Sequence, residues 1–252
     1  MKRTALITGA SSGFGAAIAH RFAAGGWNCI ITGRRADRLS DLQHQLQQEH
    51  RVEVLALDFD IRDKKATEAA IASLPDGWRS IGLLVNNAGL ALGRDYFDEA
   101  DMDDWETMID TNLKGLLYMT RAALPLMLQS GHPHIVNIGS TAGKEVYEKG
   151  NVYCASKHAV DAISKAMRID LLRHAVKVTA IHPGAAETEF SLVRFKGDAG
   201  KADAVYEGYE PLHANDIADT VWYCANLPAH VCINEIVMTC TAQANSFLTY
   251  KG

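Results

Sequence analysis

Short, nearly continuous apolar runs alternate along the chain with longer segments whose apolar residues recur every three or four positions. Such runs are typical of strands buried on both faces, and the longer pattern is typical of helices that cover them. We therefore predict strands at residues 3–8, 28–32, 52–57, 81–85, 135–138, 176–181 and 235–239. Helices are predicted at residues 16–24, 37–50, 64–74, 101–129, 152–174 and 215–226, with a break or bend near Pro125.

This alternation predicts an α/β fold built on a doubly wound, seven-stranded parallel sheet of the Rossmann type. The chain has 252 residues, 48% of them hydrophobic, which suffices for one substantial core. Because no linker, repeat or low-complexity run interrupts it, we predict a single domain over residues 1–252. Residues 185–209 have little apolar periodicity, and we expect a mobile loop with short helices that closes over a substrate.

The composition excludes several classes of protein. The formal net charge is −5, and no cluster of lysines and arginines resembles a surface for nucleic acid. No stretch is long and apolar enough to span a bilayer, and Gly9 ends the first apolar run before a signal peptide could form. Five cysteines without a Cys-x-x-Cys pair, and no His-Glu-x-x-His motif, argue against a metal site. We expect a soluble, cytoplasmic protein.

A glycine-rich turn, Gly9-Ala10-Ser11-Ser12-Gly13-Phe14-Gly15, separates the first predicted strand from the first predicted helix. Glycines let a backbone approach a pyrophosphate closely, and the following helix N-terminus adds free N–H groups and a partial positive charge. The turn could also be a plain strand–helix connection. The polar residues that follow the next strands favour a nucleotide.

The second predicted strand ends before Arg34 and Arg35, where a dinucleotide-binding fold often carries an acid for the ribose hydroxyls. Two guanidiniums instead suit the 2′-phosphate of NADP, because arginine offers charged, forked donors to phosphate oxygens. Alternatively, both are solvated charges at the start of the next helix. After the third strand a carboxylate can accept a hydrogen bond from the adenine amino group, and we prefer Asp60 to Asp58 for this contact.

Tyr153 and Lys157 lie four positions apart in a predicted helix, so the phenol and the ammonium share one face. A cation at about 4 Å interacts by about 4 kcal/mol at an effective dielectric of about 20, which lowers a phenol pKa by about three. Tyr153 could then exchange protons near neutrality. Ser140 lies thirteen positions upstream, at the end of an apolar run. The alternative is an exposed aromatic–cation pair on an amphipathic helix.

Asparagines mark two further positions. Asn87, Ala88 and Gly89 follow the fourth strand and form a turn of small residues. The amide of Asn87 could hold the main chain in place around a ribose, but asparagine is also common in ordinary turns. Asn112 lies inside a predicted helix, where asparagine is mildly unfavourable, which invites a functional explanation.

Taken together, the motifs resemble those of the short-chain dehydrogenase/reductase family. The resemblance spans residues 2–239 and rests on Thr8-Gly9-Ala10-Ser11-Ser12-Gly13-Phe14-Gly15, Asn86-Asn87-Ala88-Gly89, Asn112, Ser140, Tyr153-x-x-x-Lys157, and Pro183-Gly184 followed by Thr188. It implies that Tyr153 transfers a proton, that Lys157 lowers its pKa and holds the nicotinamide ribose, and that Ser140 orients the substrate oxygen. Asn112 would hold a water that connects Lys157 to solvent.

The resemblance also implies a site for NADP. Its expected residues are Gly9, Ser11, Ser12, Gly13, Phe14, Gly15, Arg34, Arg35, Asp60, Ile61, Asn87, Ala88, Gly89, Tyr153, Lys157, Pro183, Gly184 and Thr188. Two positions depart from the family pattern: Phe14 stands where many members carry Ile, and Ala185 where many carry a larger apolar residue against the nicotinamide.

Three longer strings resemble one subgroup of the family, the NADP-dependent dehydrogenases of 3-hydroxy acids. They lie at residues 87–93, 104–112 and 188–198. That subgroup acts on serine, allo-threonine and related acids and reduces malonic semialdehyde. We therefore expect a 3-hydroxy acid substrate that contacts Ser140 and Tyr153, with Arg194 as a partner for its carboxylate unless Arg194 is a solvated loop residue. The resemblance further implies a homotetramer.

Other functions remain open at this point. Another family activity, such as 3-oxoacyl-carrier-protein reduction or sugar-alcohol oxidation, would use the same catalytic residues. A nucleotide-sensing protein would have no need of the proton-transfer residues, and an epimerase would normally add a sizeable C-terminal domain.

Overall fold

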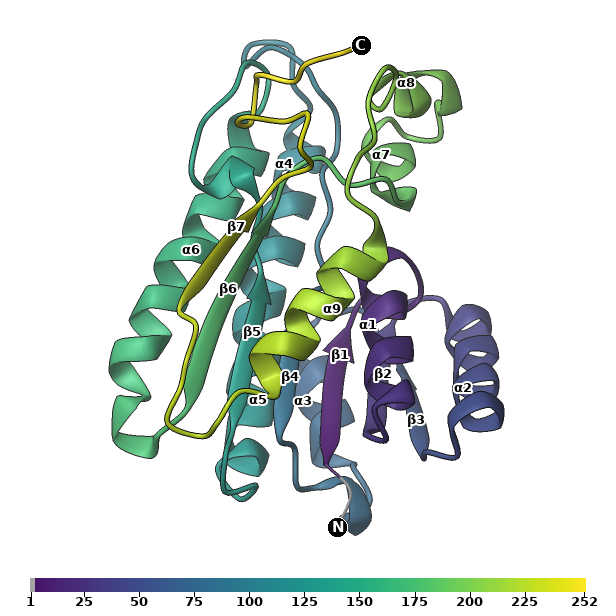
Figure 1. Ribbon diagram of the computed structural model, residues 1–252, viewed down its shortest axis with the longest axis vertical. Helices are drawn as coiled ribbons and strands as arrows, with labels where there is room; N and C mark the ends of the chain where they lie inside the picture. The colour runs from purple at the N-terminus through teal and green to yellow at the C-terminus, as the bar shows by residue number, and fades with distance from the viewer. Residues whose placement is uncertain (1–2) are drawn as a thin grey trace.

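The computed structural model describes residues 3–252 and forms a seven-stranded, all-parallel sheet with helices on both faces (Figure 1). The predicted fold class is confirmed. The strands lie side by side in the order β3-β2-β1-β4-β5-β6-β7. Residues 1 and 2 of the predicted domain lie outside the described residues.

All seven predicted strands are present, and their ends differ from the predictions by at most two residues. Their bounds are β1 Thr4–Thr8, β2 Asn28–Gly33, β3 Val54–Asp58, β4 Leu83–Asn86, β5 His134–Ile138, β6 Lys177–Pro183 and β7 Glu235–Met238. The helices are α1 Gly13–Ala24, α2 Ala36–His50, α3 Lys64–Ala72, α4 Met102–Ile109, α5 Leu116–Met127, α6 Asn151–Asp170, α7 Glu189–Arg194, α8 Ala199–Ala204 and α9 Ala214–Ala225.

The sheet is buried on both faces, which explains why its strands are continuous apolar runs. Successive side chains of a strand point to opposite faces. In β1, Ala5 and Ile7 pack into one apolar core with residues of α1, α2 and α9. Leu6, between them, packs into a second core with residues of α3 and α5.

The strand order reverses at β1, where the chain steps to β2 and β3 on one side and returns to β4 on the other. Ligands of such sheets bind outside the carboxyl ends of the strands at this point. The segments that follow β1 and β4 meet there. Thr8 Oγ1 accepts hydrogen bonds from the backbone N–H groups of Asn87 at 3.0 Å and Ala88 at 2.9 Å.

The predicted break near Pro125 is wrong. α5 passes through Pro125 and ends at Met127, so the missing N–H of proline costs one hydrogen bond close to the helix end. The irregular turn lies instead at Asp110–Gly115, a π-helical segment between α4 and α5. Such a turn holds one extra residue and often occurs at functional sites. Here it contains Asn112.

Residues 185–209 carry two short helices, α7 and α8. Figure 1 shows them beyond the end of the sheet toward which β1 points, beside the entry to α9. Within residues 3–252, no helix combines the length and the apolar character needed to cross a membrane.

Candidate active site

A cleft of about 700 Å³ lies beside the carboxyl ends of the strands. It is lined by nearly all of the predicted site residues: Gly9, Ser11, Ser12, Gly13, Phe14, Arg34, Arg35, Asp60, Ile61, Asn87, Ala88, Gly89, Ser140, Tyr153, Lys157, Pro183, Gly184, Thr188 and Arg194. Gly15 and Asn112 are not part of the lining. Both are buried directly behind it, and their contacts indicate a supporting role.

The glycine turn forms a tight cradle at the start of α1. Gly9 and Gly13 adopt φ angles of +65° and +53°, which L-residues rarely adopt. A Cβ on Gly15 would lie 2.6 Å from Asn87 Nδ2 and would overlap the Gly9 carbonyl oxygen. Asn87 Nδ2 donates to the carbonyl oxygens of Thr8 at 2.8 Å and Gly9 at 3.2 Å. With the free N–H groups of α1 beside it, this cradle fits a pyrophosphate.

Arg35, expected at a 2′-phosphate, contacts the glycine turn and an acid from a distant segment. Its guanidinium donates to Ser11 Oγ at 3.0 Å, to Ser12 Oγ at 2.7 Å and to Glu189 Oε2 at 3.0 Å. Arg38, which the sequence did not single out, donates to Glu189 Oε1 at 2.6 Å. Hydroxyls and guanidiniums gathered here, with an anion already among them, fit a phosphate group.

At the end of β3 the structure favours Asp60, which follows the strand, over Asp58, its last residue, as a ligand-binding residue. Asp60 and Arg34 line the cleft, and Asp58 does not. The Asp60 carboxylate accepts hydrogen bonds of 2.6–3.1 Å from the Arg62 guanidinium, which lowers the pKa of Asp60. Asp60 is therefore a charged acceptor, and its contact with adenine stays a prediction.

Tyr153 and Lys157 of α6 line the cleft together with Ser140, which follows β5. Tyr153 is only 8% exposed and Lys157 only 6%. The Lys157 ammonium donates to the carbonyl oxygen of Ile138 at 3.0 Å. The pair is therefore buried at the cleft, and the alternative of an exposed aromatic–cation contact is wrong.

The charge state of this pair differs from the expectation based on spacing. Burial raises the pKa of the Tyr153 phenol and Tyr147 raises it further, whereas Ser140 and the Arg194 guanidinium lower it. Lys157 is not one of the main influences on the Tyr153 phenol, and burial lowers the pKa of its own ammonium to about 8. In the structure, loss of hydration outweighs the expected attraction between the two groups.

Asn112 braces the back wall of the cleft. Its side chain exchanges two hydrogen bonds with the backbone of Leu90, both 2.8 Å long. Its Nδ2 also donates to Ser156 Oγ of α6 at 3.0 Å. Asn112 therefore ties the segment after β4 to the helix that carries Tyr153. Its proposed water-holding role stays a prediction.

Arg194, the last residue of α7, places a cation beside the phenol. Its guanidinium donates to Tyr147 Oη at 3.1 Å and to the Gly93 carbonyl oxygen at 3.3 Å. The guanidinium carbon lies 5.5 Å from the centre of the Tyr153 ring. The sequence interpretation missed Tyr147 and Arg94, which also line the cleft, because neither belongs to a recognisable motif.

Comparison with known proteins decides the family. The family model described as short chain dehydrogenase matches residues 3–197, more than half of the chain. The chain belongs to the short-chain dehydrogenase family. The resemblance expected from the motifs is thereby confirmed.

Two curated relatives and one solved structure are similar over nearly their whole lengths. The NADP-dependent 3-hydroxy acid dehydrogenase YdfG of Salmonella typhi is 51% identical over 240 residues, 95% of each chain. Sulfoacetaldehyde reductase 2 of Chromohalobacter salexigens is 47% identical over 245 residues, 97% of this chain and 96% of its own. The closed form of a serine dehydrogenase complexed with NADP⁺ is 47% identical, covers 99% of both chains and superimposes with a TM-score of 0.91.

In this short-chain dehydrogenase the residues after β7 also return to the cleft. Gln243 Oε1 accepts a hydrogen bond of 2.7 Å from the backbone N–H of Ala185. Gln243, Phe247 and Lys251 line the cleft. The sequence interpretation missed this wall because no periodicity shows where an irregular segment packs.

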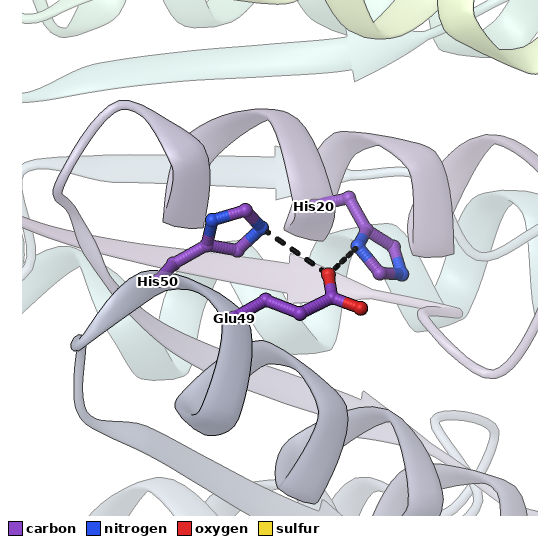
Figure 2. Close-up of side chains that lie close together, drawn as sticks. All are labelled: His20, Glu49 and His50. Carbon is purple, nitrogen blue, oxygen red and sulfur yellow. Dashed lines mark ion pairs between the residues drawn. The ribbon is translucent and has the colours of Figure 1, made fainter.

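Two groups of histidines and acids outside the cleft lining bring possible metal ligands within 4.8 Å of one another. In the first, Glu49 Oε2 lies 3.8 Å from His20 Nδ1 and 3.5 Å from His50 Nε2, between α1 and α2 (Figure 2). In the second, which contains Asp161 and Glu235, the Lys144 ammonium already pairs with both carboxylates. A motif search along the chain cannot find such groups, because each forms only when separate elements pack.

The low pKa of Lys157 predicts a pH dependence of stability. The pKa of Lys157 is about 8 in the folded chain and 10.5 in the unfolded chain, so between these pH values the unfolded chain holds the Lys157 proton more tightly. The free energy of unfolding therefore rises with pH in that window. Relative to Lys157→Met, wild type should gain about 2 kcal/mol of unfolding free energy between pH 7 and 9.5, measured by urea denaturation. A constant difference between the two proteins would show that Lys157 titrates normally.

Proposed function

We propose that the protein is an NADP-dependent oxidoreductase that interconverts the hydroxyl and oxo groups of small 3-hydroxy acids. Serine, allo-threonine and the pair 3-hydroxypropionate/malonic semialdehyde represent this class. The observation that carries the proposal is the buried Tyr153–Lys157 pair, which lines one cleft with Ser140 and the glycine turn. The activities named for the similar proteins support the choice of substrate class.

The residues of the cleft have distinct roles in this proposal. When bound, NADP supplies or accepts a hydride at its nicotinamide ring. Burial keeps the Tyr153 phenol protonated, the form that can protonate a substrate carbonyl oxygen, and in oxidation Tyr153 takes the hydroxyl proton. Ser140 orients the substrate oxygen. The Lys157 ammonium holds the nicotinamide ribose, and Asn112 holds a water that connects Lys157 to solvent.

The orientation of an acid substrate depends on Arg194 in this proposal. Arg194→Ala should raise the KM for serine and for 3-hydroxypropionate about tenfold to a hundredfold, because a charge-assisted hydrogen bond contributes about 1.5–3 kcal/mol. Steady-state kinetics would measure this, with NADP⁺ affinity as the control. Arg194→Lys keeps the positive charge but lacks the paired donors of a guanidinium, so its KM should lie between those of wild type and Arg194→Ala. An unchanged KM for both acids in Arg194→Ala would remove Arg194 from the substrate site.

A substrate panel tests the proposed activity. Formation of NADPH from NADP⁺ and of NADH from NAD⁺ is measured with L-serine, D-serine, L-allo-threonine, 3-hydroxypropionate and isethionate. We expect turnover of 3-hydroxy acids with NADP⁺. Isethionate is included because a relative is named as a sulfoacetaldehyde reductase and its product also joins a primary alcohol to an anionic group. Turnover of isethionate alone would move the substrate class from carboxylates to sulfonates.

The same assays separate the remaining alternatives. A carrier-protein reductase or a sugar-alcohol dehydrogenase would leave the acid panel unconsumed and turn over its own substrates with the same cofactor. A nucleotide-sensing protein would bind NADP⁺ and form no NADPH with any of them. The buried proton-transfer pair favours an enzyme over such a sensor.

We further propose a cytoplasmic homotetramer. Exposed apolar side chains on helices and on the edge strand β7 support association, among them Ile169 at 75%, Leu172 at 74% and Val237 at 52% exposure. Burying such side chains between subunits would be favourable. Light scattering would test for a mass four times 27.5 kDa.

A further inference from the structure

One carboxylate joins the two arginines at the start of α2. Glu189 Oε2 accepts from Arg35 at 3.0 Å and Glu189 Oε1 accepts from Arg38 at 2.6 Å. The three side chains are 39–43% exposed. The Arg38 guanidinium, and after it Arg35, lowers the pKa of Glu189, so the acid is ionised. Glu189 is the first residue of α7, far from both arginines in the sequence.

The place that Glu189 occupies is the one where a 2′-phosphate is expected. Arg35 follows β2, the strand whose end carries the ribose-recognising residues in dinucleotide-binding folds. The other donors of Arg35 are directed to Ser11 and Ser12 of the glycine turn. The third guanidinium nitrogen of Arg35, Nη1, donates to Glu189. The two carboxylate oxygens of Glu189 face the two guanidiniums, and two oxygens of a phosphate would bind the same guanidiniums in the same way.

A carboxylate and a phosphate cannot both occupy these arginines. A phosphate monoester carries a charge of about −1.5 to −2 near neutrality and three acceptor oxygens, so it repels a carboxylate that shares its partners. The larger charge of the phosphate allows it to displace the Glu189 carboxylate from the two arginines. Breaking each arginine–Glu189 ion pair costs free energy, so the protein binds the phosphate less tightly than it would without Glu189. The ribose hydroxyl of NAD carries no charge at this position and does not compete.

We infer that Glu189 competes with the 2′-phosphate of the cofactor for Arg35 and Arg38 and thereby sets the affinity for NADP relative to NAD. The inference rests on the proposed function, which supplies the cofactor. It assigns Arg38 to the phosphate site as well. It also links that site to α7, whose last residue is Arg194, so that the phosphate releases the first residue of the helix that carries the proposed substrate cation.

Binding measurements on Glu189→Gln test the inference. Dissociation constants are measured for NADP⁺, NAD⁺ and adenosine 2′,5′-bisphosphate, which presents the phosphate without the nicotinamide. We expect Glu189→Gln to bind NADP⁺ and the bisphosphate about fivefold to tenfold more tightly, because two partly exposed ion pairs no longer compete. Affinity for NAD⁺ should not change.

The control is Glu187→Gln, the same loss of charge at an exposed residue two positions away that pairs with neither arginine. It should leave all three affinities unchanged. Glu189→Ala repeats the test with the side chain shortened. Unchanged or weaker NADP⁺ binding in both Glu189 variants, with wild type still preferring NADP⁺ to NAD⁺, would overturn the inference. A wild type that does not prefer NADP⁺ would instead overturn the proposed cofactor.

Discussion

Tyr153→Phe should reduce turnover by at least about a thousandfold while leaving NADPH binding nearly intact. General acid–base catalysis by a positioned side chain contributes about 10²–10⁴ in rate, and phenylalanine has no proton to exchange. The ring remains, so its contacts with Phe190 at 5.7 Å between centroids and with the Arg194 guanidinium can persist. Initial rates of NADPH formation from 3-hydroxypropionate would measure the loss, and NADPH fluorescence would measure binding.

The matched control is Tyr223→Phe, which removes the same hydroxyl from a tyrosine that is 58% exposed on α9. Its turnover should equal that of wild type. If Tyr153→Phe kept more than a few per cent of the wild-type rate, Tyr153 would have no part in proton transfer.

Gly15→Ala should abolish cofactor binding and destabilise the fold by about 3 kcal/mol, the upper range for overpacking a closed site. The new methyl group would overlap the Gly9 carbonyl oxygen and lie 2.6 Å from Asn87 Nδ2. Backbone atoms cannot move aside as a flexible side chain does, so the turn must open. Urea denaturation would measure the loss of stability, and NADP⁺ titration the loss of binding.

Gly77→Ala is the control for this change. A Cβ at Gly77 meets no atom within 4 Å, and its φ is not positive, so stability and NADP⁺ affinity should not change. Normal NADP⁺ binding by Gly15→Ala would show that the glycine turn does not form the pyrophosphate site.

The fold could be predicted from the sequence because local and tertiary preferences agree along the sheet. Ala5, Leu6 and Ile7 are buried on opposite faces, and a strand covered on both sides needs an apolar residue at every position. The π-helical segment Asp110–Gly115 could not be predicted. Its geometry depends on hydrogen bonds that Asn112 makes to Leu90 and Ser156, residues far away in sequence.

The centre of the candidate site could be predicted for a similar reason. Tyr153 and Lys157 are one helical turn apart, so spacing alone places them together. Their protonation could not be predicted, because burial depends on the walls of the cleft: burial raises the pKa of Tyr153 and lowers that of Lys157. An effective dielectric of about 20 suits partly hydrated charges, whereas Tyr153 and Lys157 are both buried.

The periphery of the site could not be predicted because it is assembled from distant segments. Arg38 lies on the outer face of α2 and Glu189 on α7, and nothing in the sequence relates them. Gln243 and Phe247 reach the cleft from the irregular segment after β7. Such contacts form only when separate elements pack together, and the spacing of motifs along the chain does not predict that packing.

The extra residue in the turn that contains Asn112 restricts how this protein can change length. Deleting one residue there would let the helix become regular, with α4 and α5 still in register and only the residues of the turn itself facing new directions. The Asn112 amide would then face away from Leu90, leaving polar backbone groups buried and unpaired. Losing a residue at this turn would therefore disturb the back wall of the cleft, although the two flanking helices kept their places.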